Sequence, residues 1–361
     1  ASGAFVMPIG PVYSDYAESA QFFLETVGED VVRTTPRFFY KYRGLEKLAE
    51  GQPIDRVLLM AERFSGTSAF AHSLAFCQAV ERICEFHPNA RIQALRSLLA
   101  ELERLRSHVS SIAGICKSTA LAVAASQASI LEEELLRLSC VLTGHRYFFG
   151  VNVPGGLTLN ISDENCSKLA SSVTEVVQRL GVLHRTLRLS SSFLDRLEAV
   201  GIVSESDAIS YGLVGPVARA SGVARDLRKV LPYGSYNLNL EFNSPVEFEG
   251  DGYARLRILF SEAEESCEII RQIASSLPPG NLVLEDFEIK PGEGLGWVEA
   301  PIGAAFHWVK IEGNGQVGRY RVTPPSFMNW HGFHLAAENF AFQDFPIILA
   351  TFGLSCAECD R

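Results

Sequence analysis

The sequence predicts a mainly α-helical protein with a small β element, and three observations support this fold class. Apolar residues recur with helical spacing from about residue 54 to residue 277. Short extended segments broken by Gly and Pro occupy both ends, at residues 1–35 and 280–325. The 361 residues are 47% hydrophobic and 20% charged, which is enough apolar material for a large core. No linker or internal repeat divides the chain, so we expect a single domain over 1–361, a helical bundle with short antiparallel sheets from the two terminal segments.

The first extended segments are FVMPIGPVY at residues 5–13 and AQFFLETVGEDVVRTT at residues 20–35. The clearest helix covers residues 90–112, where an apolar residue follows every three or four positions. Pro88 and Asn89 stand directly before it as a helix start signal. The same periodicity predicts helices at residues 128–142, 166–197 and 253–277.

The last part of the chain returns to strands. Alternating patterns predict strands at residues 283–290, 296–300, 306–313 and 318–324. A final helix is expected around GFHLAAENFAF, residues 332–342.

Charge and hydropathy exclude several classes of function. The formal net charge is −10 and the basic residues are scattered, so a nucleic-acid groove is not expected. The most apolar long stretch, residues 110–131, is interrupted by Lys117 and by small polar residues, which argues against a membrane span. The eight cysteines lie in a chain without a recognisable export signal, so we expect buried reduced thiols rather than a disulfide framework.

The strongest chemical motif is the pair Cys356 and Cys359 in GLSCAECDR. Two thiolates at this spacing converge on one point, which suits zinc, nickel, an iron–sulfur cluster or a redox disulfide. A single pair also occurs as two buried small apolar residues, and the motif alone leaves these interpretations open.

The stretch ERFSGTSAFAH has the form of a second cysteine pair in which Ser65 and Ser68 stand at the thiol positions, with His72 four residues on. Alcohols are poor ligands for soft metals because they keep their protons at neutral pH. We expect the two serines to form local hydrogen bonds or cap a helix. The default interpretation of Glu62 and Arg63 is a solvated pair, and that of His72 is a hydrogen-bonded helix histidine.

Two further motifs have ordinary structural explanations. The charged group Arg43, Glu46, Lys47 and Glu50 suits the solvated face of a helix start. The GVNVPGG stretch at residues 150–156 predicts a turn, since it lacks the strand and helix that flank a dinucleotide site.

Taken in order, these segments resemble one superfamily, the large subunit of membrane-bound, energy-converting (group 4) NiFe hydrogenases together with the related peripheral-arm subunit of complex I that forms its quinone site. Ten segments carry the resemblance over nearly the whole chain: PIGP, YRGLEKLAEG, ERFSGTSAFAHSLAFCQAVE, ARIQALRSLLAELERLRSH, GVNVPGG, YGLVGPVARASGVARDLRKVLPYGSY, GDGYARLRILFSEAEES, EAPIGAAFHWV, TPPSFMNW and CAECDR. The length of the CAECDR ending is that of the complex I relatives.

The resemblance implies a site from which several functional groups are missing. In the hydrogenases two cysteine pairs hold nickel and iron; Cys356 and Cys359 match the second pair, whereas Ser65 and Ser68 replace the first. Ile302 stands where the family motif places an arginine over the metal. Two thiolates are half the required donor set, so we expect no NiFe centre and no other cofactor bound by this chain itself.

At other positions of the family motifs, this chain has a different residue in some cases and the family residue in others. Tyr42 replaces a histidine, while Glu46 matches the proton-transfer glutamate, and we expect Glu46 and His72 to carry protons. The quinone-site tyrosine is replaced by Gly66, and the loop histidine after Gly-Pro is absent. Tyr13 and Tyr16 lie nearby but are not expected to act as quinone ligands.

The resemblance therefore implies a large subunit of a membrane-associated oxidoreductase complex with a divergent site, on the cytoplasmic side of the inner (cell) membrane. Expected partners are an iron–sulfur small subunit with a 4Fe-4S cluster, other peripheral-arm subunits and an antiporter-like membrane arm, without nucleic acid. Electrons would pass to a sulfur substrate or to the pair Cys356–Cys359 itself. Whether the chain is an enzyme stays open, because the alternative is a catalytically silent coupling subunit. A third possibility is a reduced metal site of Cys356, Cys359 and His72 that binds zinc or iron.

Overall fold

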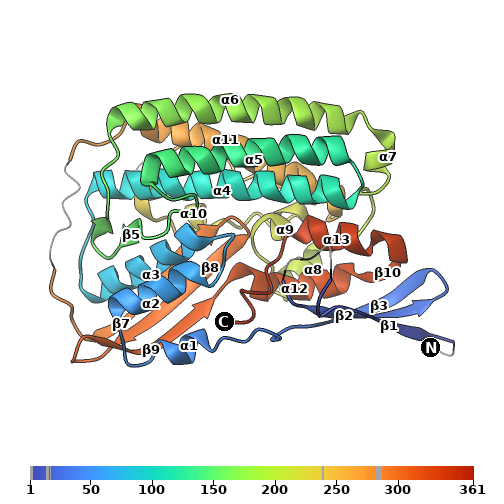
Figure 1. Cartoon of the computed structure of the whole chain (residues 1–361), viewed down its shortest axis with the longest axis horizontal. Helices are drawn as coiled ribbons and strands as arrows, with labels where there is room; N and C mark the ends of the chain where they lie inside the picture. The colour runs from blue at the N-terminus through green and yellow to red at the C-terminus, as the bar shows by residue number, and fades with distance from the viewer. Residues whose placement is uncertain (1–2, 14–15, 17, 238–239, 281–286) are drawn as a thin grey trace.

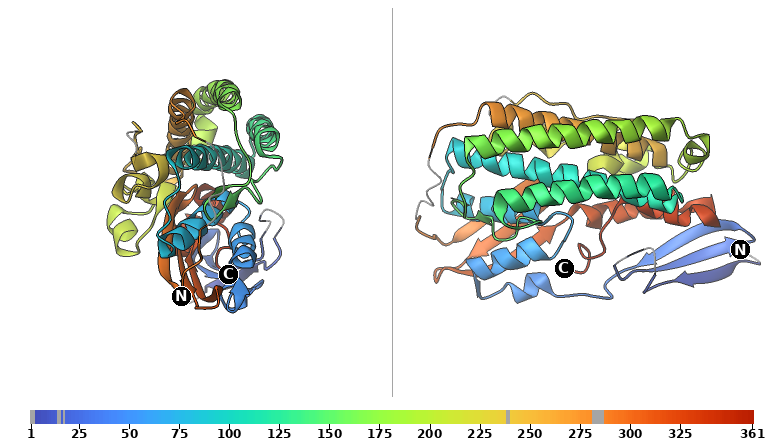
Figure 2. Two further views of the ribbon diagram at one scale, coloured as in Figure 1. Left: turned by 90° about the vertical axis from the view of Figure 1, so that its left-hand side faces the viewer. Right: turned by 45° about the horizontal axis from the view of Figure 1, so that its top comes forward.

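The computed structural model describes residues 3–13, 16, 18–237, 240–280 and 287–361. Four long helices lie side by side as a bundle (Figures 1 and 2): α4 (Ala90–Ser118), α5 (Ala122–Thr143), α6 (Asp163–Arg188) and α11 (Gly252–Ser275). Helix α4 is buried along most of its length and packs against both α5 and α11. The expected start signal is confirmed, since the Asn89 side chain accepts a hydrogen bond from the backbone of Ile92 and caps α4.

A four-stranded antiparallel sheet lies beneath the bundle, in the order β4 (Gln52–Pro53), β9 (Gln316–Thr323), β8 (Gly303–Ile311) and β7 (Gly292–Ala300). Helices α2 (Ile54–Arg63) and α3 (Ala69–Ile83) lie between the sheet and the bundle (Figure 1). Helix α3 packs closely on β7 because a Cβ atom on Gly296 would lie only 1.8 Å from the carbonyl oxygen of Ala75. Strand β7 thus fixes the position of α3, which carries His72.

A second sheet projects from one end of the molecule, in the order β1 (Phe5–Ile9), β2 (Gln21–Val27), β3 (Asp30–Arg37) and β10 (Glu338–Ala341) (Figure 1). The final helix expected at residues 332–342 is wrong in its second half. Helix α12 (Pro325–Ala336) starts earlier, and residues 338–341 form β10. Strand β10 pairs with β3, whose edge would otherwise lack hydrogen-bond partners. The chain then enters α13 (Phe345–Phe352), which the sequence pattern did not predict.

The remaining elements are short. They are α1 (Leu45–Leu48), β5 (Asn152–Val153), β6 (Gly156–Leu157), α7 (Ser191–Leu194), α8 (Glu205–Ser210), α9 (Gly215–Ala220), α10 (Leu227–Val230), η1 (Gly234–Asn237) and η2 (Phe342–Asp344). The expected turn at residues 150–156 joins β5 and β6 as a hairpin. The helix expected over residues 166–197 ends earlier, at Arg188. The strand expected at 283–290 lies outside the described residues at 283–286, and its residues 287–290 are not in a strand.

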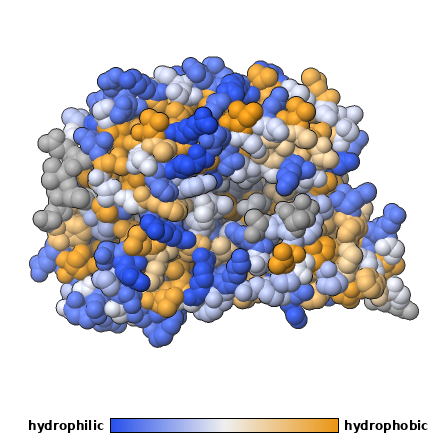
Figure 3. All heavy atoms as spheres, viewed as in Figure 1, coloured by the Kyte–Doolittle hydropathy of each residue, from blue (hydrophilic) through white to orange (hydrophobic). Residues whose placement is uncertain are grey.

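The predicted fold class, mainly helical with small antiparallel sheets, is confirmed. On the face shown in Figure 3, apolar and polar side chains are interspersed. Within the described residues, none of the helices combines the length and apolar character that a membrane crossing requires. The C-terminus lies in the middle of the molecule below the bundle, whereas the N-terminal sheet forms the far tip (Figures 1 and 2).

Candidate functional site at the C-terminal loop

The two motif cysteines lie on one tight turn that follows α13. Gly353 ends the helix with a positive φ of 59°, a conformation that glycine adopts without strain. The backbone amides of Cys359 and Asp360 then donate to the carbonyl oxygen of Cys356, at 2.9 and 3.0 Å. Both thiols are buried and neither forms a disulfide. The turn therefore presents two reduced thiols in the interior of the protein.

The segment that contains Arg43 fixes this turn from one side. The Asp360 carboxylate accepts hydrogen bonds from the backbone amides of Phe39 (2.6 Å) and Lys41 (3.1 Å). The Arg43 guanidinium donates to the carbonyl oxygens of Phe64 (2.9 Å) and Ala357 (2.6 Å). Arg43 is exposed, as the interpretation of a solvated face predicts, but its guanidinium also ties the end of α2 to the turn.

Glu46 lies at the same junction. Its carboxylate accepts a hydrogen bond from the backbone amide of Val322 (3.1 Å), pairs with Arg321, and lies 3.4 Å from Nε of Arg361. This residue thus connects α1 to β9 and to the C-terminal arginine. The neighbouring pair Lys47 and Glu50 does belong to an exposed face.

Glu358, which lies between the two cysteines in the sequence, is close to Ser65 and His72 of the other motif. Its carboxylate accepts hydrogen bonds from the Ser65 hydroxyl (2.9 Å) and the Ser326 backbone amide (2.9 Å). Nε2 of His72 lies 3.5 Å from the same carboxylate. Burial by itself raises the pKa of Glu358, but the contacts with His72 and Ser326 outweigh it and the pKa is lowered. Glu358 is therefore an anion at neutral pH, held in the interior by two hydrogen-bond donors and close to the His72 imidazole.

His72 continues into a chain of buried hydrogen-bonding side chains. Its Nδ1 lies 2.9 Å from Nε2 of His307, and Nδ1 of His307 lies 2.8 Å from the Tyr320 hydroxyl. Burial lowers the pKa of His307 well below its usual value, which keeps that imidazole neutral. The chain Glu358–His72–His307–Tyr320 thus joins the cysteine turn to β9, and the charge of Glu46 acts on Tyr320 at its other end.

A second side of the turn is covered by residues before β2. The Tyr16 hydroxyl donates to the carbonyl oxygen of Leu354 (2.6 Å) and accepts from the Cys356 thiol at 3.4 Å. The Glu18 carboxylate accepts hydrogen bonds from the Ser355 hydroxyl (2.9 Å) and the Ala357 backbone amide (2.7 Å). Burial raises the pKa of Cys356 to about 12 and also raises that of Cys359, so both are thiols at neutral pH.

The three positions at which this chain departs from the family motif occupy different surroundings. Ser65 donates to Glu358, and Ser68 lies 3.4 Å from the Thr67 hydroxyl. Ser68 stands at the N-cap position of α3 without a capping hydrogen bond from its side chain. That helix start is instead held by Glu103, whose carboxylate accepts from the amides of Phe70 and Ala71. Ile302 is buried in the same apolar cluster as Cys356 and Cys359.

The donors at this turn are poorly suited to a nickel–iron group. Two are thiols, one of which donates to Tyr16, and two are alcohols already hydrogen-bonded to neighbours. Alcohols hold their protons and bind soft metals weakly. Throughout the described ranges, no three or more His, Cys, Asp or Glu side chains are grouped so that they would hold a metal ion.

The Glu62–Arg63 pair is another place where the default interpretation fails. Arg63 is half exposed, but Glu62 is buried, and its carboxylate accepts a hydrogen bond from the backbone amide of Gly150 (2.6 Å). This contact anchors the 150–156 turn on α2.

Sequence reasoning missed Glu358, Glu18 and His307 and set Tyr16 aside. One available signal was the strand alternation in β8, which points Ala305, His307 and Val309 to the buried face. Glu358 could have been noticed as the acid enclosed by the two cysteines. Nothing local marked Glu18, because its partners lie more than 330 positions away.

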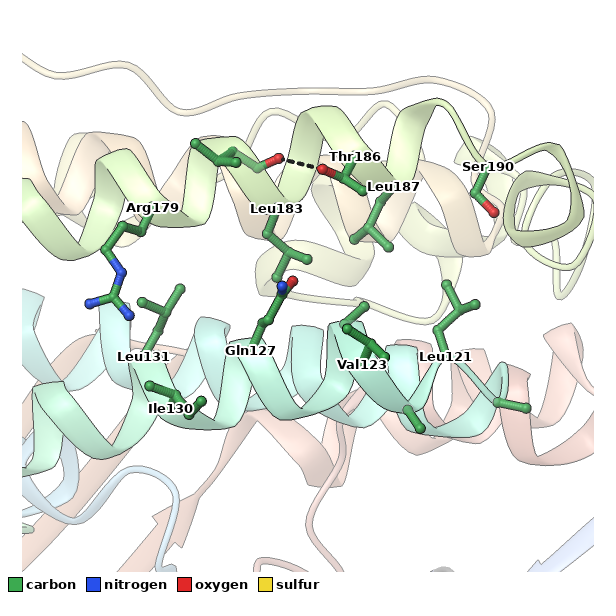
Figure 4. A pocket seen from close by; sticks show the side chains of 14 residues that line it. Leu121, Val123, Gln127, Ile130, Leu131, Arg179, Leu183, Thr186, Leu187 and Ser190 are labelled. Atoms are coloured by element: carbon green, nitrogen blue, oxygen red, sulfur yellow. Dashed lines mark hydrogen bonds between the residues drawn. The ribbon is translucent and has the colours of Figure 1, made fainter.

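An apolar groove of about 770 Å³ lies between α5 and α6, away from the turn (Figure 4). Its walls include Leu121, Val123, Ile130, Leu183 and Leu187. None of the predicted site residues lines it, so this groove is not part of the candidate site.

Comparison with known proteins places this geometry in one family. The chain matches the family of the respiratory-chain NADH dehydrogenase 49 kDa subunit over residues 119–291 and 281–361. It is 28% identical to a subunit of the NADH-quinone oxidoreductase of Chloroherpeton thalassium, over 99% of this chain and 87% of that protein. It is 29% identical to formate hydrogenlyase subunit 5 of Escherichia coli, over 98% of this chain but only 62% of that longer protein.

A solved structure is also similar along the full length. A chain of the membrane-bound sulfane sulfur reductase, an archaeal respiratory membrane complex, superposes with a TM-score of 0.93 at 26% identity, covering 100% of this chain and 99% of the other. The predicted resemblance to complex I subunits and hydrogenase large subunits is confirmed. The chain belongs to the family of the respiratory-chain NADH dehydrogenase 49 kDa subunit.

Proposed function

We propose that this chain is the large subunit of a membrane-associated respiratory oxidoreductase in which Cys356 and Cys359 exchange two electrons with a sulfur substrate. The observation that carries the proposal is the reduced thiol pair on one turn, next to hydroxyls at the two positions where nickel-binding relatives have thiolates. The similarity to a chain of a sulfane sulfur reductase supports a sulfur compound as the substrate class.

We further propose that no NiFe centre forms here. Two thiols and two alcohols supply half of the anionic donors that such a centre needs. At Ile302 the side chain is apolar, so the cation that the resemblance places over the metal is also missing. The thiol pair then has to carry out the chemistry without a resident metal.

The proposed reaction is a thiol–disulfide exchange followed by re-reduction. The two thiols cleave an S–S bond of the substrate, R–S–S–R′, and give RSH, R′SH and a Cys356–Cys359 disulfide. Two electrons and two protons then regenerate the two thiols. The electrons come from the 4Fe-4S cluster of an iron–sulfur partner, so that atoms and charge balance over the cycle.

The buried chain of side chains behind the turn is suited to supply the protons. Glu358 lies between the cysteines, and His72, His307 and Tyr320 follow at hydrogen-bond spacing or close to it. Glu46, partly exposed, lies near the far end. We propose that Glu46 and His72 carry protons and that His307 and Tyr320, which the sequence did not identify, lie between them.

The assembly follows from the same family relationship. We propose that the iron–sulfur partner binds on the cysteine side and that further peripheral-arm subunits and an antiporter-like membrane arm complete the complex. The chain would then lie on the cytoplasmic side of the cell membrane.

Replacement of both cysteines tests the function. We expect the Cys356→Ala, Cys359→Ala double variant of the assembled complex to reduce polysulfide only at the background rate, because no thiol remains to accept the substrate sulfur. Cys140→Ala removes an exposed thiol of α5 and is the matched control, expected to leave turnover unchanged.

An unchanged turnover in the double variant would leave only the second candidate, a catalytically silent subunit that couples the iron–sulfur partner to the membrane arm. Burial of both thiols and their raised pKa values are the observations that favour it. Assembly of the double variant into the complex has to be checked in both cases by co-purification of the partner subunits.

A further inference from the structure

A second cluster of charged side chains lies inside the protein, between the bundle and the sheet. It joins α4, α9, the α10 segment, α11 and β7, and none of its members is more than 2% exposed. The members of this buried charge cluster are Glu101, Arg104, His108, Arg219, Asp226, Arg228, Glu262 and Glu299. The proposed function does not use it.

The cluster contains three arginines and four carboxyl groups, together with one histidine. Arginine keeps its charge in proteins, so four ionised carboxylates and a neutral imidazole leave a net charge of −1. An uncompensated charge without access to water is strongly unfavourable. Charge balance therefore requires one bound proton, on a carboxyl group or on His108.

Two of the carboxylates are strongly compensated. Glu101 accepts hydrogen bonds from Arg104 (3.2 Å), Arg228 (2.9 Å) and Ser266 (2.7 Å), and also from Tyr236. These donors hold the pKa of Glu101 at about 2, although burial alone raises it. Asp226 accepts hydrogen bonds from the Arg228 guanidinium at 2.6, 3.0 and 3.2 Å, from the Arg228 backbone amide at 2.9 Å and from the Ser244 hydroxyl at 2.8 Å.

The other two carboxyl groups of the cluster, those of Glu262 and Glu299, have different hydrogen-bond donors. Glu262 lies 2.7 Å from Nε of Arg219 and 2.9 Å from Nε2 of His108. Glu299 has one charged donor, Nη1 of Arg219 at 3.0 Å, and one backbone donor, Leu227 N at 3.0 Å. The same guanidinium also donates to Glu262, through Nε. Asp226 faces the same guanidinium at 3.9 Å and repels a second negative charge at Glu299.

We propose that Glu299 is a neutral carboxylic acid at neutral pH and that the buried charge cluster is a binding site for one exchangeable proton. The raised pKa of Glu299, caused first by burial and then by the charge of Asp226, agrees with this placement. Burial also lowers the pKa of His108, which faces Glu262, Arg104 and Arg219, so the imidazole is not the holder. The surroundings of Glu262 and Glu299 separate the pKa values of these two carboxyl groups, so Glu299 holds the one proton and Glu262 is ionised.

The cluster also contacts the end of β7, close in sequence to a residue that packs in the apolar cluster of Cys356. Arg104 donates to the carbonyl oxygens of Glu299 (2.5 Å) and Ala300 (3.2 Å), so the cluster holds the end of β7 as well as the side chain. Ile302, three residues later, packs in the apolar cluster of Cys356. Ionisation of Glu299 places a third anion around Arg219, beside Glu262 and Asp226, and alters the forces on this strand end.

Two other features of the site point to an exchangeable ligand. Nη2 of Arg219 is fully buried and has no acceptor within the part of the chain that the structure describes. A cavity of about 20 Å³ lies beside His108, Ile302 and Gly353, which is room for one water molecule. The cavity thus extends from His108 of the cluster to Gly353, which precedes the loop that carries Cys356.

The carboxylic-acid carbonyl band in the infrared spectrum of the folded chain tests the proposal directly. We expect the wild type at neutral pH to show this band, with its hydrogen–deuterium shift, and Glu299→Gln to lack it. Glu133→Gln, which removes a partly exposed carboxylate outside the cluster whose pKa the hydrogen bond from Arg146 lowers to about 2, is the control and is expected to keep the band. A wild type without the band, or a band that persists in Glu299→Gln, would overturn the assignment.

The pH dependence of unfolding is an independent measurement. The folded pKa of Glu299 lies above its usual value of 4.5, so its contribution to stability is complete below that pH and is lost as the pH rises through the folded pKa. Above about pH 5, the unfolding equilibrium constant of wild type should rise about tenfold more per pH unit than that of Glu299→Gln, the difference of one proton. Parallel profiles for the two proteins would contradict the proposal. Neither measurement uses turnover, so both are independent of the proposed function.

Discussion

At the scale of single residues, the exchange of sulfur for oxygen at position 65 changes what the side chain does. A thiolate at this place would donate electron pairs to a metal, whereas the Ser65 hydroxyl donates its proton to Glu358. The same alcohol therefore removes a metal ligand and stabilises a buried anion. In this arrangement His72 lies between Glu358 and His307.

We expect Ser65→Ala to lower the free energy of unfolding by about 2 kcal/mol, because a buried carboxylate loses a charge-assisted hydrogen bond. Urea unfolding at neutral pH measures this. Ser126→Ala, which removes a hydroxyl from an exposed turn of α5, is the control and should change stability by less than about 0.5 kcal/mol. Equal effects of the two substitutions would show that Glu358 does not depend on Ser65.

At the scale of helices and strands, periodicity predicted the long elements and failed for those set by distant contacts. Helix α4 follows from its apolar spacing and its Asn89 cap alone. Strand β10 could not be predicted in this way, since its four residues are extended only because they complete the edge of β3. The residues of the candidate site fall into the same two groups, those predicted from local patterns and those set by distant contacts. Cys356 and His72 were found from local motifs, whereas Glu18 and His307 act through partners far away in the sequence.

The contact between α3 and β7 allows a sharp prediction. Gly296→Ala would place its Cβ 1.8 Å from the carbonyl oxygen of Ala75, so the helix and the strand have to separate. We expect a loss of about 3 kcal/mol in unfolding free energy. Gly313→Ala, at the turn between β8 and β9, meets nothing within 4 Å and is the control. Thermal unfolding of the two variants compares them, and a melting temperature unchanged by Gly296→Ala would mean that this packing is looser than described.

At the scale of the whole molecule, the family fold is retained, while residues at the candidate site differ from the hydrogenase motif. The chain superposes over its full length on a chain of the sulfane sulfur reductase at a TM-score of 0.93. The bundle, the sheet and the C-terminal turn keep their arrangement, while the side chains at positions 65, 68 and 302 depart from the hydrogenase pattern. A shared fold does not fix the reaction, which is why the fold was predictable and the reaction has to be argued from the site.

Metal analysis of the purified complex tests the changed centre. Because the turn offers only two thiols, we expect no stoichiometric nickel, and iron only in the amount held by the iron–sulfur partner. Nickel at one atom per chain would contradict the proposed function. Zinc bound at one atom per chain, and lost in a Cys356→Ala variant, would instead support a reduced metal site.

The C-terminal turn has a consequence for how the protein is made. It is held by Tyr16 and Glu18, by the segment around Arg43, and by Ser65 and Ser326, all of which leave the ribosome before it does. Domains fold as units during synthesis from the N-terminal side, so the partners of the turn have time to assemble first. A nascent chain that still lacks residues 355–361 has a scaffold but neither Cys356 nor Cys359. Any factor that loads, oxidises or inspects this site therefore acts after translation has passed Cys359.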